Sequence, residues 1–376
     1  MKMQHTLLMA GWTLALPFCP GRAQAIVGKP CVFSDYFAEW RAFPLIVRDA
    51  EGNLSCGRNR LNNGGATPGP AAAGTPCATA TRTCGRFEPQ GHFTYRDAAG
   101  TVQDLWYERY RERDRWHVDA LNRGGLTWAA AAAGDPSGVS VDGVFHVAYR
   151  DLEGGIQELR SGSPWQALCL NRDGATGAPP AAGDPVQVVR NGTLHVFYRD
   201  WAGGLQHLWL EAGWRAEQLN LGGRTQASAA VGEPAVAGMP GVLHATYRDA
   251  AGALQDLRLD GNGWQAQRLN DGGATDAPRA QGDPCARAVG GAIHHVTYRD
   301  AAGAIWDLGH EGGWRAQRLN LGAATGAPAA ASDPVTLVPP SGWEYVAYVD
   351  VQGEVQLLSH ALDHPWRLGP LERLGR

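Results

Sequence analysis

A unit of about 50 residues repeats along almost the whole chain, and this repeat constrains the fold more than any other feature. Its clearest marker is a segment that begins with His and ends in Tyr-Arg-Asp. This marker occurs at His92–Asp97, His146–Asp151, His195–Asp200, His244–Asp249 and His295–Asp300. Degenerate copies lie at Leu45–Asp49 and Tyr345–Asp350, which brings the number of units to seven.

A proline, in three units in the context Gly-Asp-Pro, is a second and independent marker. It occurs at Pro30, Pro76, Pro136, Pro185, Pro234, Pro284 and Pro334. Successive prolines are 46, 60, 49, 49, 50 and 50 residues apart. Because the two markers give the same count, we expect seven structural units.

The unit that follows Pro185 shows what each repeat builds. Alternating and apolar segments separated by turn signals predict four strands, at 186–190, 193–199, 205–210 and 213–219. Asn191-Gly192 between the first two is a strong hairpin signal. A loop of roughly 14 residues then leads to the next proline. Four antiparallel strands repeated seven times predict an all-β fold, a seven-bladed β-propeller nearly free of helix.

The N-terminus is typical of an export signal. Lys2 is followed by an apolar stretch of about 12 residues, too short to span a bilayer comfortably, and then by Ala23-Gln24-Ala25, a small-x-small cleavage pattern. We therefore expect a signal peptide at 1–25, a single propeller domain at 26–376, and a secreted or periplasmic protein with no membrane span. A net charge of −4 without basic runs argues against nucleic-acid binding.

Cysteine usage fits an oxidising compartment. Removal of the signal leaves six cysteines, and four of them lie close together at Cys31, Cys56, Cys77 and Cys84. We expect at least one disulfide bond among these four, with the pairing left open. The remaining two, Cys169 and Cys285, are expected to be small buried residues.

Repeated polar and aromatic residues are the candidate site. The marker His recurs in five units, an acidic residue usually follows 12 residues later on the third strand, and a Trp begins the fourth strand. Same-parity residues on neighbouring strands can reach one another. Sugars are bound by such sets because hydroxyls need directional partners while C–H faces stack on aromatic rings. The candidate residues are His92, Asp104, Trp116, His146, Glu158, Trp165, His244, Asp256, Trp264, His295, Asp307 and Trp314.

Two units are expected to be weak or inactive. The set His195, His207 and Trp214 lacks the carboxylate, and the seventh unit has Tyr345 and Leu357 at the His and acid positions. A structural interpretation also stays open: the Trp side chains fill space between blades, and the His–acid pairs tie strands together. For the Tyr-Arg-Asp triplet we favour structure, with the Asp capping the following turn and the Arg pairing with the Asp of a nearby Gly-Asp-Pro.

The pattern His-x-x-Tyr-Arg-Asp-x-x-Gly, a Leu or Ile, an acid, and then Gly-Trp resembles the repeat of secreted propeller lectins, notably the Aleuria-type fucose-binding family. The resemblance covers residues 30–370. It implies sugar sites between adjacent blades, each with an Arg on the second strand, a Glu on the third and a stacking Trp. Here His stands in place of that Arg, for example His146 with Glu158 and His295 with Asp307.

The sequence therefore favours a non-enzymatic, multivalent carbohydrate-binding protein with glycans or glycoconjugates as partners. A scaffold that binds a protein on one propeller face is the alternative. A glycoside-processing enzyme is less favoured, because catalysis needs one asymmetric set of residues; the non-repeated Asp142 and the region of Glu39 are its candidates. No cofactor is expected, and no metal site, because one His per unit is too dispersed to share an ion.

Overall fold

The structure is a computed structural model that describes residues 26, 31–32, 45–56, 59–81, 90–110, 113–289, 293–337, 343–361 and 364–369. These residues form β-strands, turns and loops, and none of them is helical. No helix within these ranges meets the length and apolarity needed to cross a membrane. The segment predicted to be a signal peptide, residues 1–25, lies outside the described residues.

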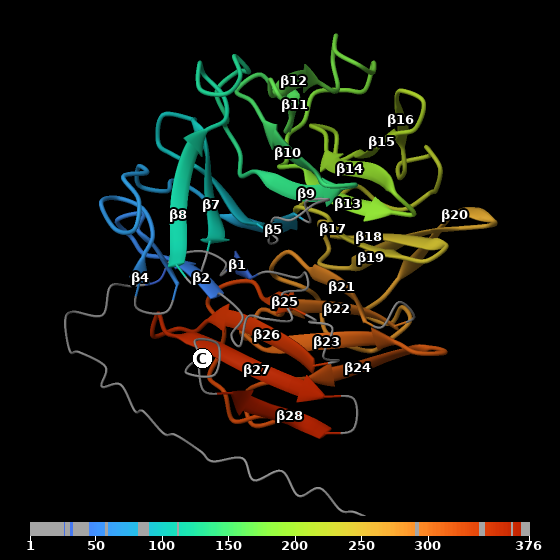
Figure 1. Ribbon diagram of the computed structural model, residues 1–376. Coiled ribbons are helices and arrows are strands. Elements are labelled where there is room, and N and C mark those ends of the chain that lie inside the picture. Colours follow the sequence, from blue (N-terminus) through green and yellow to red (C-terminus); the bar gives the residue numbers. More distant parts are fainter. Residues whose placement is uncertain are drawn as a thin grey trace, which may run out of the picture.

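In this part of the chain, 28 strands form seven four-stranded sheets, each an antiparallel meander in chain order (Figure 1). Blades 1 to 3 consist of β1 (Cys31–Val32), β2 (Leu45–Arg48), β3 (Leu54–Cys56), β4 (Asn59–Arg60), β5 (Cys77–Thr81), β6 (Gln90–Arg96), β7 (Val102–Tyr110), β8 (Arg113–Ala120), β9 (Ser137–Val141), β10 (Val144–Arg150), β11 (Ile156–Arg160) and β12 (Gln166–Cys169). Blades 4 and 5 consist of β13 (Val186–Arg190), β14 (Thr193–Arg199), β15 (Leu205–Leu210), β16 (Trp214–Gln218), β17 (Ala235–Met239), β18 (Val242–Arg248), β19 (Leu254–Asp260) and β20 (Gly263–Arg268). Blades 6 and 7 consist of β21 (Cys285–Val289), β22 (Ile293–Arg299), β23 (Ile305–His310), β24 (Trp314–Arg318), β25 (Val335–Leu337), β26 (Trp343–Val349), β27 (Val355–Ala361) and β28 (His364–Gly369).

The seven blades close into a ring, which confirms the predicted propeller. The first strand of each blade contacts the first strand of the next, from β5 and β9 round to β21 and β25, and β1 contacts both β5 and β25. In Figure 1 the blue N-terminal blade accordingly lies beside the red C-terminal one. Each blade supplies its own four strands, so closure needs no exchange of a strand between the two ends.

The Asp of the Tyr-Arg-Asp triplet caps the turn that follows it. In blade 3, Asp151 Oδ1 accepts hydrogen bonds from the main-chain N–H groups of Glu153 (2.9 Å) and Gly155 (2.7 Å). The same two bonds recur in blades 2 to 7. The triplet Tyr is buried, and its hydroxyl donates to a carbonyl of the loop that enters its blade, as Tyr198 does to Pro179 at 2.7 Å.

The Arg of the triplet connects its blade to the next. Arg150 Nε lies 3.2 Å from Asp184 Oδ1, and Asp184 Oδ2 accepts the Asp135 N–H at 2.8 Å. The equivalent ion pairs are Arg96–Asp135 (3.9 Å), Arg248–Asp283 (3.7 Å) and Arg299–Asp333 (3.4 Å). The structural interpretation of the triplet is therefore confirmed, because its Asp caps a turn, its Tyr holds a loop and its Arg connects neighbouring blades.

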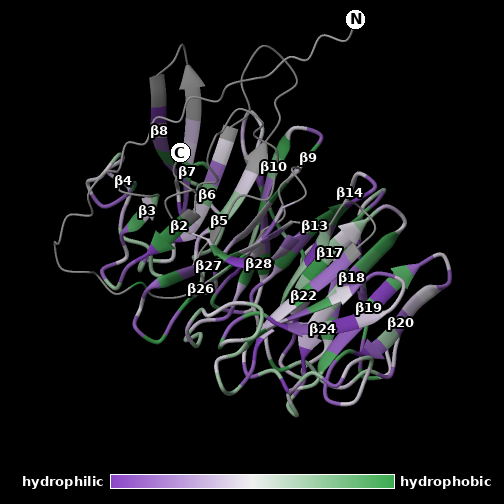
Figure 2. Ribbon diagram, turned by 90° about the horizontal axis from the view of Figure 1, so that it is seen from below, coloured by the Kyte–Doolittle hydropathy of each residue, from purple (hydrophilic) through white to green (hydrophobic). Residues whose placement is uncertain are grey.

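The core consists of separate apolar clusters between neighbouring blades. One example joins Ile156 and Leu170 of blade 3 to Val196, Tyr198 and Leu208 of blade 4. Toward the outside of each blade the strands become polar, and β24 (Trp-Arg-Ala-Gln-Arg) is exposed after its first residue. Figure 2 shows this change, with β24 coloured as hydrophilic and hydrophobic segments on strands nearer the axis.

A buried asparagine that the sequence analysis did not single out supports every blade from 1 to 6. Asn171 is inaccessible to solvent, its Oδ1 accepts the Ile156 N–H at 2.7 Å, and its Nδ2 donates to the carbonyls of Gly154 and Pro179. The equivalent residues are Asn62, Asn122, Asn220, Asn270 and Asn320. Each one satisfies backbone groups where the loop leaves the fourth strand.

The thiols of Cys56, Cys77, Cys169 and Cys285 are free and partly buried. Cys84 and the side chain of Cys31 lie outside the described residues, so a bond between these two stays a prediction. Cys169 and Cys285, which were expected to be small buried residues, are only partly buried. Burial raises the pKa of the Cys56 thiol to about 11, which keeps it protonated and unreactive.

Candidate functional site

The predicted His–carboxylate pairs form in four blades. The Nδ1 to carboxylate distances are 2.8 Å for His92–Asp104, 2.7 Å for His146–Glu158, 2.8 Å for His244–Asp256 and 3.0 Å for His295–Asp307. The partners are diagonal rather than directly opposite, since Glu158 lies across from Ala148, two residues beyond His146. Each pair thus joins the second and third strands of one blade through a strong hydrogen bond.

The side chains of three of these pairs are almost completely buried. His146 is 4% exposed and Glu158 6%, and His92, Asp104, His244 and Asp256 are buried to a similar extent. Any ligand would therefore reach only the rim of a pair. His295 is the most open of the four histidines, with a side chain 16% exposed.

Each tryptophan was expected to join the His–carboxylate pair of its own unit, but the structure places it against the preceding blade. Trp264 donates from Nε1 to Glu217 of blade 4 (2.8 Å), and Trp314 donates to Gln267 of blade 5 (3.0 Å). Trp116 and Trp165 likewise pack on apolar clusters that include residues of the preceding blade. The fourth strand faces backward around the ring, so each carboxylate meets the indole of the next unit. Trp264 thus lies against His207, the residue at the acid position of blade 4, with ring centroids 5.5 Å apart, and Trp214 lines one groove with Glu158 of blade 3.

A groove of about 580 Å³ lies between blades 3 and 4 and brings such a set to the surface. Glu158 and Arg160 of β11 lie on one side, and Leu210 of β15 and Trp214 of β16 on the other. The edge strand β12 contributes Gln166 to Leu168, and the Arg160 guanidinium is hydrogen-bonded to the Gln166 side chain. The groove thus combines a carboxylate acceptor, a guanidinium donor, an amide and an indole.

Trp214 also lines a second groove of about 430 Å³, bounded by the loop at 176–179 and by residues 215–218 of β16. Trp214 belongs to a unit that was expected to be weak or inactive. It nevertheless lines a groove with Glu158 of the preceding blade, so a carboxylate and this indole face the same space.

Blade 4 replaces the missing carboxylate with Glu217 from the fourth strand, a residue that sequence reasoning missed. His195 Nδ1 lies 2.8 Å from His207 Nε2, and His207 Nδ1 lies 2.9 Å from Glu217 Oε1. Although burial alone would raise the pKa of Glu217, hydrogen bonds from His207, Trp264 and Arg224 lower it to about 2. Burial and the neighbouring His207 lower the pKa of His195 to about 3, so that imidazole is neutral. The sequence feature that could have indicated Glu217 is His207, a second His at the acid position that itself needs a hydrogen-bond partner.

Blade 7 has no His–carboxylate pair among its described residues, in line with its sequence. Leu357 is buried and Tyr345 packs beside it, in a cluster with Ile26 and Val47 of blade 1. At the boundary with blade 6, Glu344 lies 3.5 Å from His295, whose other neighbour is Asp307. Burial alone would lower the pKa of His295, but these two carboxylates raise it well above its usual range. The result is a buried ion pair.

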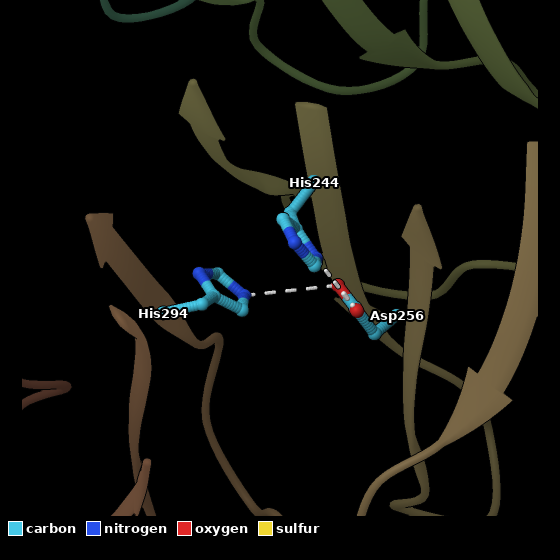
Figure 3. Close-up of side chains that lie close together, drawn as sticks. All are labelled: His244, Asp256 and His294. Carbon is cyan, nitrogen blue, oxygen red and sulfur yellow. Dashed lines mark hydrogen bonds and ion pairs between the residues drawn. The ribbon is translucent and has the colours of Figure 1, made fainter. Parts of the chain in front are cut away.

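Histidines of adjacent blades do meet at one place, which corrects the expectation that they are too dispersed to share an ion. His294 of β22 faces Asp256 of β19, with Nε2 3.8 Å from Oδ1, while Asp256 Oδ2 is bonded to His244 of β18 (Figure 3). The rings of His244 and His294 are stacked, with centroids 4.0 Å apart. His294 and His295 point to opposite faces of β22, as their alternation predicts.

Of the two carboxylates considered for catalysis, only Asp142 lies among the described residues, and its place in the fold is explained by a turn. Asp142 has a φ of 49° and forms, with Gly143, the turn between β9 and β10. This turn explains why Asp stands there, since Asp and Gly tolerate the left-handed region. Glu39 lies outside the described residues.

Neither a protein-family model nor a curated protein matches the chain. Solved structures do share its fold. The BP39L lectin of Burkholderia pseudomallei is 15% identical, with 92% of this chain and 98% of that one covered and a TM-score of 0.64. AofleA of Arthrobotrys oligospora is 12% identical over 78% and 87% (TM-score 0.54), and the fucose-specific lectin of Aleuria aurantia is 14% identical over 78% and 93% (TM-score 0.52). At such identities the similarity establishes the fold alone.

Proposed function

We propose that the protein binds carbohydrate in the grooves between neighbouring blades, with the groove between blades 3 and 4 as its principal site. One observation carries the proposal: Glu158, Arg160 and Trp214, from two blades, line the same groove. A carboxylate and a guanidinium offer the directed acceptor and donors that sugar hydroxyls require, and an indole offers a flat apolar face for sugar C–H groups.

The equivalent blade boundaries, with Asp104 and Trp165 or Asp256 and Trp314 at the matching sequence positions, are proposed as further sites. Several weak sites on one ring would bind a spaced glycan far more tightly than one site alone. The proposal includes export through residues 1–25, which would expose the protein to glycans outside the cytosol. The lectins that share the fold support this proposal at the level of the carbohydrate class, and the Aleuria aurantia protein among them is specific for fucose.

A glycan array on the purified protein tests the proposal, with Trp214→Ala and Glu158→Gln as variants. Trp201→Ala is the matched control, because Trp201 is in the same blade, is 77% exposed, and lies outside the residues that line the groove. We expect signal for the wild type and for Trp201→Ala, and a roughly two- to tenfold loss for Trp214→Ala, since aromatic stacking contributes about 0.5–1.5 kcal/mol. Absence of wild-type binding to any glycan, or equal binding by Trp214→Ala, would overturn the proposal.

A protein-binding face is the second candidate, and it has an observation of its own. Leu152, Trp201 and Val351 hold the same position, directly after the triplet Asp, in three blades, and they are 79%, 77% and 60% exposed. Large exposed apolar side chains at a repeated turn suit contact with a protein surface. Capture of a protein by the wild type that is lost in Trp201→Ala and retained in Trp214→Ala would favour this candidate over the lectin.

A further inference from the structure

Two imidazoles and a carboxylate form a buried cluster at the boundary of blades 5 and 6 (Figure 3). His244 and Asp256 come from β18 and β19, and His294 from β22 of the next blade. One potential ligand atom of each residue lies within 4.8 Å of the other two. All three side chains are at least nine-tenths buried.

His294 is the unusual member of this cluster. It is inaccessible to solvent, and neither ring nitrogen has a hydrogen-bond partner of ordinary length among the described residues. The carbonyl of Arg287 offers it no more than a long contact. Leaving a buried polar group without a partner is costly, so such a group calls for an explanation. Its Nε2 points at Asp256 Oδ1 across 3.8 Å, which is too far for a hydrogen bond.

Packing alone does not require an imidazole at this position. The equivalent residue of blade 3 is Phe145, whose ring stacks on His92 of blade 2 with centroids 4.3 Å apart. His294 stacks on His244 in nearly the same way, at 4.0 Å. Blades 4 and 5 have Leu194 and Leu243 at this position, both buried. The ring nitrogens of His294 therefore serve something other than filling space.

We propose that His244, Asp256 and His294 bind one divalent transition-metal ion of the zinc type between blades 5 and 6. Imidazole nitrogen and carboxylate oxygen are ligands that zinc prefers, at about 2.0–2.2 Å. Two ligands of one ion can then be up to about 4.2 Å apart, and the 3.8 Å between His294 and Asp256 falls inside this limit. The distance that is wrong for a hydrogen bond is suitable for an intervening ion.

A neighbouring hydroxyl supports the carboxylate in this role. Thr246 Oγ1 donates to Asp256 Oδ1 at 2.8 Å, which fixes the plane of the carboxylate toward His294. Such outer hydrogen bonds orient ligands in known metal sites. Because the ligands come from two blades, the ion would also cross-link them.

The cluster formed by His295, Asp307 and Glu344 at the next boundary is different. Its one imidazole already lies between two carboxylates, with Nδ1 3.0 Å from Asp307 and 3.5 Å from Glu344. Within the described ranges no unpartnered imidazole faces that cluster, so we assign it no ion.

Zinc binding to the full chain, stripped with a chelator, tests the proposal. We expect one Zn²⁺ per chain by calorimetry and elemental analysis, and a rise in Tm of about 3–5 °C at a hundredfold excess of zinc over Kd. His294→Phe is the matched variant because it reproduces the arrangement of Phe145 on His92. It should keep the fold and lose at least a hundredfold in zinc affinity, and Asp256→Asn should lose affinity as well.

His364→Gln, which alters an exposed histidine on β28 of blade 7, controls for adventitious surface binding and should bind zinc as the wild type does. The proposal is overturned if the wild type binds no zinc, or if His294→Phe binds it equally well. It is also overturned if His294→Phe is more stable than the wild type both with and without zinc, since His294 would then be a packing residue only. The glycan variants Trp214→Ala and Glu158→Gln lie at the boundary of blades 3 and 4, away from this cluster, so the two proposals can fail separately.

Discussion

At the scale of single residues, the sequence predicts contacts within a blade better than contacts between blades. The spacing of 12 residues and equal parity were enough to pair His146 with Glu158, because both residues lie on one meander. The partner of Glu158 across the boundary, Trp214, was missed, because repeat spacing does not show which way the fourth strand faces. His294 could have been noticed by comparing units, since the other units have Gly, Phe, Leu or Glu before the marker position.

Glu217 gives a prediction at this scale. Its carboxylate accepts hydrogen bonds from His207 and Trp264, and its pKa is lowered to about 2. A carboxylate with a depressed pKa stabilises the fold above its usual pKa of about 4.5 and loses this effect as pH falls toward 2. We expect Glu217→Gln to lower the free energy of unfolding by about 2 kcal/mol at pH 7, with a smaller deficit at pH 3.5. Urea denaturation at both pH values measures this.

The control for this prediction is Glu211→Gln in the same blade. Glu211 pairs with Arg215 at 3.3 Å on the surface, where an ion pair contributes little. Its replacement should change the free energy of unfolding by less than about 0.5 kcal/mol. A deficit of Glu217→Gln that is equal at pH 7 and pH 3.5 would contradict the role of its charge.

The pKa of Glu233 is shifted in the opposite direction, upward. It occupies the place of the Gly-Asp-Pro aspartate, where burial, Asp184 and Asp283 raise its pKa to about 7. A carboxyl with a raised pKa in the folded state favours the fold while protonated, so stability is lost as pH rises from about 4.5 to 7. Glu233→Gln should therefore match the wild type near pH 5 and exceed it at pH 8, by up to about 3 kcal/mol.

Thermal unfolding of the two proteins across this pH range checks the prediction. Asp184→Asn is the comparison, because Asp184 accepts bonds from Arg150 and from the Asp135 N–H. It should destabilise at pH 5 and at pH 8 alike. If Glu233→Gln is less stable than the wild type at pH 8, Glu233 is charged and favourably paired there.

At the scale of the repeated element, almost all of the fold was predictable. The strands expected at 186–190, 193–199 and 205–210 are β13, β14 and β15 with the same bounds, because alternation and the Asn-Gly turn mark both ends of each strand. Two units depart from the common pattern: the fourth strand of blade 1, β4, has two residues, and a charged insertion lengthens the hairpin of β7 and β8 in blade 2.

The Gly of the repeated Gly-Asp-Pro segment is needed because a side chain at this position would overlap with the next blade. A Cβ added to Gly134 would overlap with Asp184 Oδ1 of the next blade. Gly134→Ala should therefore displace Asp184 from Arg150 and the Asp135 N–H and destabilise by about 1–3 kcal/mol. Chemical denaturation measures the change. Gly326→Ala, whose Cβ would meet nothing within 4 Å, should have no such cost.

At the scale of the whole molecule, closure of the ring sets the cooperativity. An open array of repeats has two ends with one neighbour each and can fray from them. Here the boundary of blades 7 and 1 has its own apolar cluster, in which Leu357 and Val349 pack with Ile26 and Val47. Every blade therefore has two neighbours, and we expect β2 and β26 to resist hydrogen exchange as strongly as β14 of blade 4.

Leu357→Ala tests this expectation, because it removes a 3% exposed side chain from the closing cluster at a cost of about 2–4 kcal/mol. If the ring unfolds as one unit, amide exchange governed by global unfolding accelerates by the same factor in the second strands of all seven blades. If the ring opens first, exchange accelerates only in blades 1 and 7, and closure then contributes no global stability. Val351→Ala, at a 60% exposed turn of the same blade, should leave exchange unchanged in every blade. Hydrogen–deuterium exchange followed by mass spectrometry distinguishes these outcomes strand by strand, because each blade yields its own peptides.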